Sequence, residues 1–143
     1  PMSVAHILQT KGSDVISISP TAAIMEVAGV LAENKIGAVL VIEGEDHVAG
    51  IISERDVVRA LAKKGKDVAG AKVGDFMTRE LITCAPDATI NQIMSLMTQG
   101  RVRHLPVLED GKLCGMISIG DIVKRRIAEV EFEAEEMKRY ISG

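Results

Sequence analysis

Apolar and polar positions along the first half of the chain change their period several times. Short runs rich in Val and Ile are typical of strands, whereas apolar residues three and four apart are typical of amphipathic helices. Pro20 ends the first run because proline cannot donate to a strand ladder. A polar turn between the next two runs indicates a hairpin. The predicted order is a strand at Val15–Ile18, a helix over 21–34, strands at Ala38–Ile42 and Val48–Ile52, and a helix over 54–63.

The same pattern then occurs a second time, which makes an internal repeat the main feature of the sequence. The offset between the copies is 66 residues at first and 65 after the hairpin loop, where the second copy is one residue shorter. Apolar, glycine, proline and acidic positions all recur at these offsets. The matched pairs include Pro20/Pro86, Ile24/Ile90, Leu31/Met97, Gly50/Gly115, Ser53/Ser118 and Asp56/Asp121.

Each copy is a βαββα unit that would leave one apolar face of its sheet exposed. Two such units can cover each other, so we predict a mixed α/β (α+β) fold built from tandem repeats. The polar, glycine-containing segment 63–67 is the expected linker. We expect one module over 1–143, with repeats at 13–64 and 73–128. A short segment of similar pattern precedes each copy, at 4–8 and at 73–78.

The composition argues against several classes of protein. The net charge of −3 is spread along the chain without a basic stripe, so we expect no nucleic acid partner. No apolar run approaches the length of a membrane span, and no charged leader with an apolar segment is found. We therefore expect no membrane partner and a cytoplasmic location. With only two Phe and one Tyr, the core must be built from aliphatic side chains and Met.

Candidate catalytic residues are missing from the pattern. Cys84 and Cys114 lack a metal-like spacing and are expected to be reduced core residues, with a single disulfide as the alternative. No cluster of His, Cys and carboxylates is found, nor a Ser–His–Asp, Walker or Rossmann signature. We therefore expect no enzymatic activity, no metal and no catalytic cofactor.

A Gly-x-x-Ser-x-x-Asp motif ends the last strand and begins the last helix of each copy, at 50–56 and at 115–121. One interpretation is a helix cap, in which the Ser oxygen accepts from a free N–H and the acid lies in the first turn. The other is a ligand site, because a helix N-terminus can hold a phosphate and a nearby carboxylate can accept from ribose hydroxyls. Its occurrence in both copies favours the ligand site.

With these motifs, and with Leu105–Val107 on a strand, the chain resembles the cystathionine-β-synthase (CBS) repeat family, whose paired module is called a Bateman domain. The resemblance covers almost the whole chain. It implies two repeats packed through their sheets with pseudo-twofold symmetry and two clefts between them. It also implies a regulatory module, not an enzyme, that binds AMP, ADP, ATP or NAD.

In that family each cleft takes Ser and Asp from one repeat and an adenine-binding wall from the other. We call the cleft at Ser53 and Asp56 the first cleft, and the one at Ser118 and Asp121 the second cleft. The resemblance implies that the first cleft contains Ser53, Arg55 and Asp56 facing Ile82, Thr83, Arg103 and His104. It implies that the second contains Met116, Ser118, Gly120 and Asp121 facing Ile16, Gly37 and Ala38.

The two clefts differ in charge because residues 101–104 read Arg-Val-Arg-His where residues 35–38 read Lys-Ile-Gly-Ala. On a strand, Arg101 and Arg103 would point to one side and His104 to the other. The resemblance implies a basic residue at this position against the ligand phosphate, a role that suits the arginine fork. A solvated basic edge is the alternative.

The last part of the chain predicts a long helix over 121–141. No Pro or Gly interrupts it up to Tyr140, and its apolar residues are spaced alternately four and three apart. This apolar stripe packs either on the 4–8 segment of its own module or across the twofold axis of a homodimer, as the resemblance favours. The stripe consists of Val123, Ile127, Val130, Ala134, Met137 and Ile141.

Two functions follow from these observations. In the first, an adenine nucleotide occupies one or both clefts and shifts the angle between repeats or subunits, and an effector protein in trans reads that change. In the second, the chain is a constitutive dimerisation scaffold with vestigial clefts. Because Ser and Asp are present in both copies, we favour the nucleotide-binding regulator.

Overall fold

The computed structural model describes residues 2–143; Pro1, part of the predicted module, lies outside the described residues. The first copy of the repeat forms as predicted, although the ends of most elements differ from the predicted ones by one to three residues. A short strand is followed by a helix, a hairpin and a second helix. Their bounds are β1 Ser17–Ile18, α2 Ile24–Asn34, β2 Ala38–Glu43, β3 His47–Ser53 and α3 Glu54–Lys64.

The second copy departs from the prediction at its first strand. Only Cys84 forms a parallel bridge, to Val107, where β1 pairs two residues with β2. Pro106 stands where the first copy has Leu40, and proline has no N–H, so one backbone donor fewer is available to this ladder. The other elements are α5 Ile90–Gly100, β4 His104–Glu109, β5 Lys112–Ser118 and α6 Ile119–Ser142.

The segment ahead of each copy packs on the other copy. Val4 of α1 (Val4–Lys11) is buried in the core of the second copy, and its amide donates to Ala88 O at 2.9 Å. Val73 of α4 (Val73–Phe76) is buried in the core of the first, with its amide 2.9 Å from Ala22 O. The predicted polar linker is largely a 3-10 helix, η1 (Gly65–Gly70). The two copies are thus tied together by exchanged leading segments.

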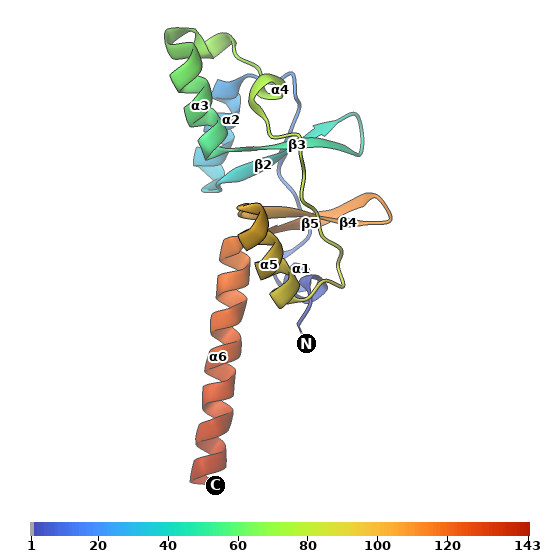
Figure 1. Ribbon diagram of the computed structural model, residues 1–143, viewed down its shortest axis with the longest axis vertical. Coiled ribbons are helices and arrows are strands. Elements are labelled where there is room, and N and C mark those ends of the chain that lie inside the picture. Colours follow the sequence, from blue (N-terminus) through green and yellow to red (C-terminus); the bar gives the residue numbers. More distant parts are fainter. Residues whose placement is uncertain (1) are drawn as a thin grey trace.

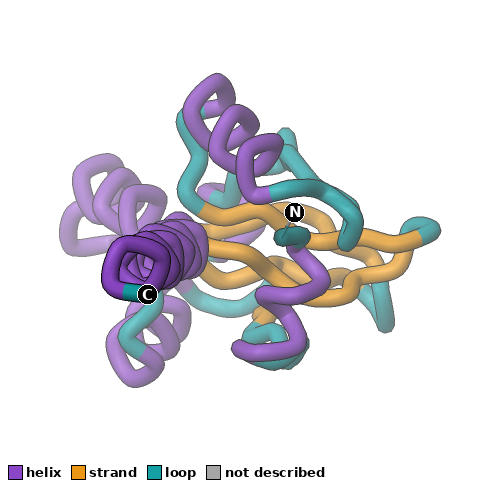
Figure 2. Tube along the Cα trace, turned by 90° about the horizontal axis from the view of Figure 1, so that it is seen from below, coloured by secondary structure: helices purple, strands orange, loops and turns teal. Residues whose placement is uncertain are grey.

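Two hairpins meet at the middle of the molecule (Figures 1 and 2). β2 and β3 are covered on their outer side by α2 and α3, and β4 and β5 lie against α1 and α5. Both cores are mainly aliphatic, although Phe76 belongs to the first. Ile24, Val39 and Ile52 are fully buried in the first copy, and their counterparts Ile90, Leu105 and Ile117 are buried in the second. The predicted mixed fold of tandem repeats is confirmed.

Both cysteines are free, so the alternative of a disulfide is wrong. Cys84 is buried in the second core, which raises the pKa of its thiol to about 11. Cys114 packs at the edge of the same core. Both are therefore core residues, as expected.

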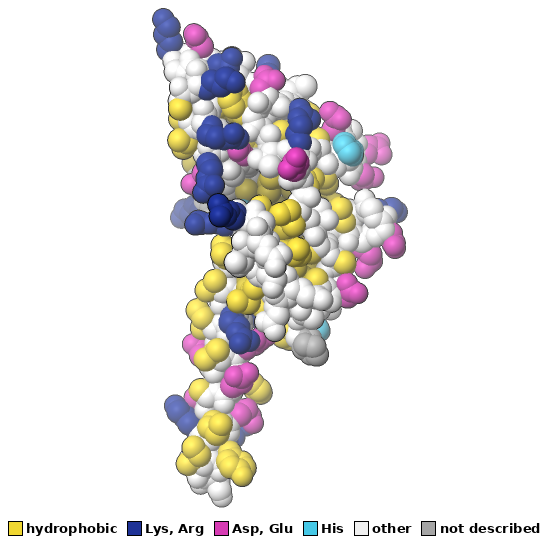
Figure 3. Space-filling model, viewed as in Figure 1, with side chains coloured by type: hydrophobic (Ala, Val, Ile, Leu, Met, Phe, Trp, Pro, Cys, Tyr) yellow, Lys and Arg dark blue, Asp and Glu magenta, His cyan; other side chains and the backbone are white. Residues whose placement is uncertain are grey.

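Helix α6 projects away from the rest of the molecule (Figure 1), and its apolar stripe lies in the open (Figure 3). Val123, Ile127 and Val130 are each more than half exposed, and Met137 and Ile141 are more exposed still. The alternative in which the stripe packs on its own module is therefore wrong. Across residues 2–143, none of the helices combines the length and the apolar character needed to cross a bilayer.

Candidate functional site

The first Ser-x-x-Asp motif caps helix α3. Asp56 Oδ2 accepts from the amide of Ser53 at 2.9 Å and from its hydroxyl at 3.1 Å, and Ser53 Oγ accepts from the amide of Asp56 at 3.3 Å. Asp56 Oδ1 accepts from Arg59, whose guanidinium also donates to Phe76 O at 3.2 Å. The cap interpretation of the motif is thus confirmed, and it fixes Asp56, which is only 4% exposed, at the base of the helix.

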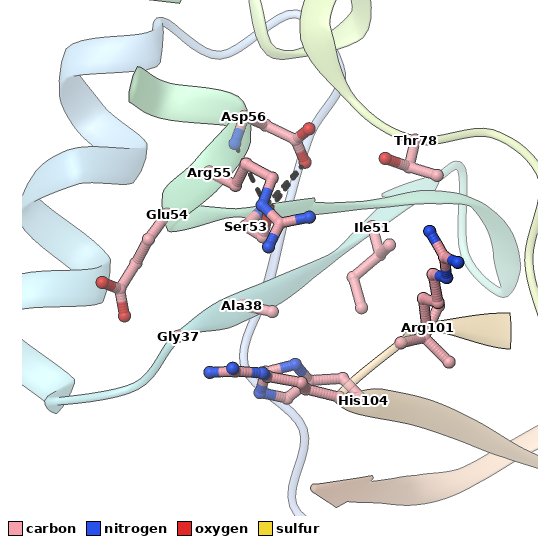
Figure 4. A pocket seen from close by; sticks show the side chains of 12 residues that line it. Gly37, Ala38, Ile51, Ser53, Glu54, Arg55, Asp56, Thr78, Arg101 and His104 are labelled. Atoms are coloured by element: carbon pink, nitrogen blue, oxygen red, sulfur yellow. Dashed lines mark hydrogen bonds between the residues drawn. The ribbon is translucent and has the colours of Figure 1, made fainter. Parts of the chain in front are cut away.

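Next to this cap lies a cavity of about 500 Å³, within the usual size of small-molecule sites. It opens between the two copies, because its walls come mainly from β2, β3 and α3 on one side and from residues 101–104, at the entry to β4, on the other (Figure 4). Seven residues predicted for the clefts line it: Gly37, Ala38, Ser53, Arg55, Asp56, Arg103 and His104.

The cavity is rich in cationic side chains. Arg55 reaches it from α3, and Arg101 and Arg103 from the segment between α5 and β4, with Glu54 and Asp56 as the acids. The prediction that Arg101 and Arg103 lie on a strand is wrong, because β4 begins only at His104. Arg101 is instead the left-handed residue that ends α5, with φ 53°. Lys35 ends α2 with the same φ, so the repeat preserves this backbone conformation.

His104 also lines the cavity, although strand alternation predicted that it would point away from Arg103. Its ring lies against the backbone of Gly37 in the other copy, 3.5 Å from the position that a side-chain carbon there would take. Burial lowers the pKa of His104 below its usual 6.5, and Lys11 and Arg103 lower it further, against the opposite effects of Asp121 and Glu54. A neutral imidazole therefore faces the cavity near pH 7.

The second motif forms the same cap at the start of α6. Asp121 Oδ2 accepts from the amide of Ser118 at 2.8 Å, and Ser118 Oγ accepts from the amide of Asp121 at 3.2 Å. The carboxylate is also bound by Lys11 of α1, with Nζ at 2.7 Å. Burial alone would raise the pKa of Asp121, but the hydrogen bonds from Lys11 and Ser118 outweigh it and lower that pKa.

Two predicted residues line a different cleft from the one assigned to them, and the residues not yet mentioned do not line the cavity of the first cleft. Gly37 and Ala38, assigned to the second cleft, lie instead in the first, because the start of β2 borders Ser53. Ile82 packs on the second core, and Thr83 is outside the cavity lining. Ile16 is partly exposed, and Met116, Ser118, Gly120 and Asp121, which were predicted for the second cleft, are outside the lining of this cavity.

Sequence reasoning missed several residues around the two motifs. Ile51 was missed although its counterpart Met116 was predicted, so the repeat itself could have indicated it. Thr78 lies in the segment preceding the second copy, and its role follows only from the exchange of the leading segments. Glu54 and Val102 also line the cavity. Lys11 and Arg59, which bind the two aspartates, gave no signal in the sequence beyond their charge.

No group of three or more His, Cys, Asp or Glu side chains suited to a metal ion is found among residues 2–143. The cavity itself offers hydrogen-bond donors and apolar side chains. Arginine side chains and the N-terminus of α3 can hold an anion, and the apolar Ile51 and Val102 can contact a flat ring.

Comparison with known proteins shows which of them share this sequence and fold. The mitochondrial CBS domain-containing protein CBSX3 of Arabidopsis thaliana is 40% identical over 117 residues, which are 79% of this chain and 57% of that protein. This chain thus spans little more than half of that relative's length. The CBS-domain containing protein ATU1752 from Agrobacterium tumefaciens has a crystal structure with TM-score 0.84 and 44% identity, over 87% of this chain and 99% of that one.

A more distant structure is the CBS domain pair of protein MJ0100, solved in complex with 5′-methylthioadenosine and S-adenosyl-L-methionine. It has TM-score 0.75 and 25% identity, over 86% of this chain and 98% of that chain. The family model for the CBS domain matches this chain twice, at residues 4–63 and 73–128. With two such matches and the shared fold, the chain belongs to the CBS domain family.

Proposed function

We propose that this protein is a non-enzymatic regulatory module whose first cleft binds an adenine nucleotide (AMP, ADP, ATP or NAD). The observation that carries the proposal is the cavity at Ser53, which joins three arginines to a helix N-terminus. A phosphate is favoured there because guanidinium groups and the positive end of a helix dipole both attract anions. The related domain pair of MJ0100, solved with two adenosine compounds, supports an adenine ligand.

The expected orientation of the ligand follows from the positions of the charges. The phosphate lies towards Arg55, Arg101 and Arg103, and the ribose lies towards Asp56. Because one oxygen of Asp56 is already bound by Arg59, the ribose hydroxyls compete with this guanidinium. Arg59 is 59% exposed but the Asp56 side chain is only 6% exposed, so the ribose hydroxyls have to replace the hydrogen bond that this guanidinium gives up.

Binding at this position gives a physical route to signalling. The cavity takes residues from both copies, so a ligand in it contacts both and favours one angle between them. We propose that an effector protein, in the cytoplasm and in trans, recognises that angle. The exposed stripe of α6 supports a homodimer as the signalling unit.

Thermal unfolding in the presence of AMP, ADP, ATP and NAD tests nucleotide binding. A ligand at about a hundred times its Kd should stabilise the fold by roughly 2.7 kcal/mol. Native mass spectrometry of the purified protein identifies any compound that it already carries. A protein stripped of such compounds whose melting temperature responds to none of the four nucleotides would contradict the proposal.

The exposed stripe of α6 also favours the second candidate, a constitutive dimerisation scaffold. The two candidates differ in one measurable property. A scaffold binds its partner equally with and without nucleotide, whereas a regulator changes its affinity for the partner when nucleotide is added.

A further inference from the structure

The two clefts are built on equivalent positions but are filled differently. In the first, Ile51 and Asp56 line the open cavity. Their counterparts in the second, at an offset of 65, are Met116 and Asp121. The ammonium of Lys11 binds both counterparts, at 3.0 Å from Met116 O and 2.7 Å from Asp121 Oδ2. One cation thus binds two groups whose counterparts in the first copy, Ile51 O and the Asp56 carboxylate, have separate partners.

The reason lies in the segment ahead of each copy. In the first copy, Ile51 O accepts from the backbone amide of Thr78 at 2.8 Å, so its carbonyl is satisfied by the main chain. In the second copy, Met116 O accepts from the Lys11 side chain instead. The side chain of Lys11 is 38% exposed and that of Asp121 is 20% exposed, so this contact is partly withdrawn from water.

The cation that binds Asp56 does not have this effect. Arg59 is on the same helix as Asp56, three residues away, and it binds the carboxylate together with Phe76 O from outside the cavity lining. Lys11 comes from α1, more than a hundred residues away in sequence. The first carboxylate is thus bound by a residue of its own helix, whereas the second is bound by a cation from the leading segment of the other copy.

We propose that Lys11 is an intramolecular occupant of the second cleft, and that it restricts nucleotide binding to the first cleft. This inference rests on the proposed function. A ribose at Asp121 has to displace an ammonium that holds both this carboxylate and the carbonyl of Met116. Lys11 is therefore a residue that determines which of two similar clefts accepts the ligand.

Isothermal titration calorimetry with AMP tests the proposal through its stoichiometry. We expect the wild-type chain to bind a single equivalent and Lys11→Met to bind a second one. The double variant Lys11→Met/Asp121→Ala should return to a single equivalent, because the new site needs that carboxylate. Lys112→Met is the matched control: it removes an exposed lysine from β5 and should leave one equivalent.

Two results would overturn the proposal: two equivalents in the wild-type chain, or one in Lys11→Met. Failure of AMP to bind any variant would contradict the proposed function instead. The contact of Lys11 is then judged without ligand, by carboxyl NMR of Asp121. The pKa of Asp121 should rise in Lys11→Met and stay unchanged in Lys112→Met; no rise in Lys11→Met would show that Lys11 does not occupy the cleft.

Discussion

Gly50 of β3 lies against the carbonyl oxygen of Thr78, so closely that a side-chain carbon added at residue 50 would be 2.6 Å from it. The contact belongs to a backbone bridge, in which Thr78 O accepts from the amide of Ile51 at 3.0 Å. Gly115 has the same place in the second copy but faces the side chain of Leu8, at 2.8 Å. The repeat thus contains two equivalent glycines, one against backbone and one against a flexible side chain.

This difference predicts unequal costs of substitution. Gly50→Ala should lower the free energy of unfolding by about 1–3 kcal/mol, because the bridge to Thr78 must move to admit the methyl group. Gly115→Ala should cost less, because the side chain of Leu8 can rotate. Urea unfolding of the two variants measures both losses, and equal losses would contradict the explanation.

A second prediction concerns the arginines of the first cleft. Arg103→Ala should weaken AMP binding roughly ten- to a hundredfold, because a hydrogen bond between charged groups is lost. Binding of adenosine should not change. Calorimetric titration with both ligands measures the difference. Arg139→Ala is the control, since this arginine lies in the last turn of α6; equal weakening of AMP and adenosine by Arg103→Ala would rule out the phosphate contact.

The lowered pKa of His104 predicts a pH dependence of stability. Because the unfolded chain takes up the His104 proton at a higher pH than the folded one, stability should fall as the pH drops below 6.5, down to the folded-state pKa. His104→Gln should remove this part of the dependence. Urea unfolding between pH 7.5 and 5 measures it, with His47→Gln as the control at an exposed site. The same slope in all three proteins would exclude His104 as its source.

The exposed stripe predicts that α6 takes part in dimer formation. A chain that ends at Arg126 should still bind AMP but should lose dimer stability or aggregate, because removal of the stripe exposes the apolar surface on which it docks. Within the full-length chain, Met137→Glu should weaken the dimer, whereas Phe132→Glu, on another face of the helix, should not. Sedimentation equilibrium gives the masses. A wild-type monomer at micromolar concentration would contradict the dimer, and an undisturbed dimer of the truncated chain would exclude α6 from its interface.

Much of the fold could be predicted from the sequence because hydrophobic period and repetition are local and redundant. Each element of the first copy was supported by its counterpart, and the start of α3 follows from Ser53. The absence of a full strand at Cys84 was not predicted, because it depends on the neighbouring strand, where Pro106 has no N–H to donate.

The candidate site was predicted only in part, for a different physical reason. Ser53, Asp56 and Arg103 were predicted from sequence patterns, and all three line the cavity. Lys11 and Thr78 come from leading segments that cross to the other copy, and no spacing in the sequence reveals such an exchange. Contacts between distant segments, and side-chain rotamers such as that of Lys11, are set by tertiary packing.

The residues of the second motif also form the N-terminus of α6, since Ser118 caps this helix and Asp121 lies in its first turn. The helix has 24 residues, so it acts as a lever about 36 Å long. A tilt of about 5° at its N-terminus moves the tip by about 3 Å, which exceeds half the spacing of one helical turn. The bond from Lys11 to Asp121 connects α1 to the N-terminus of α6. A small movement at that contact would therefore become a larger displacement at the C-terminal end of α6.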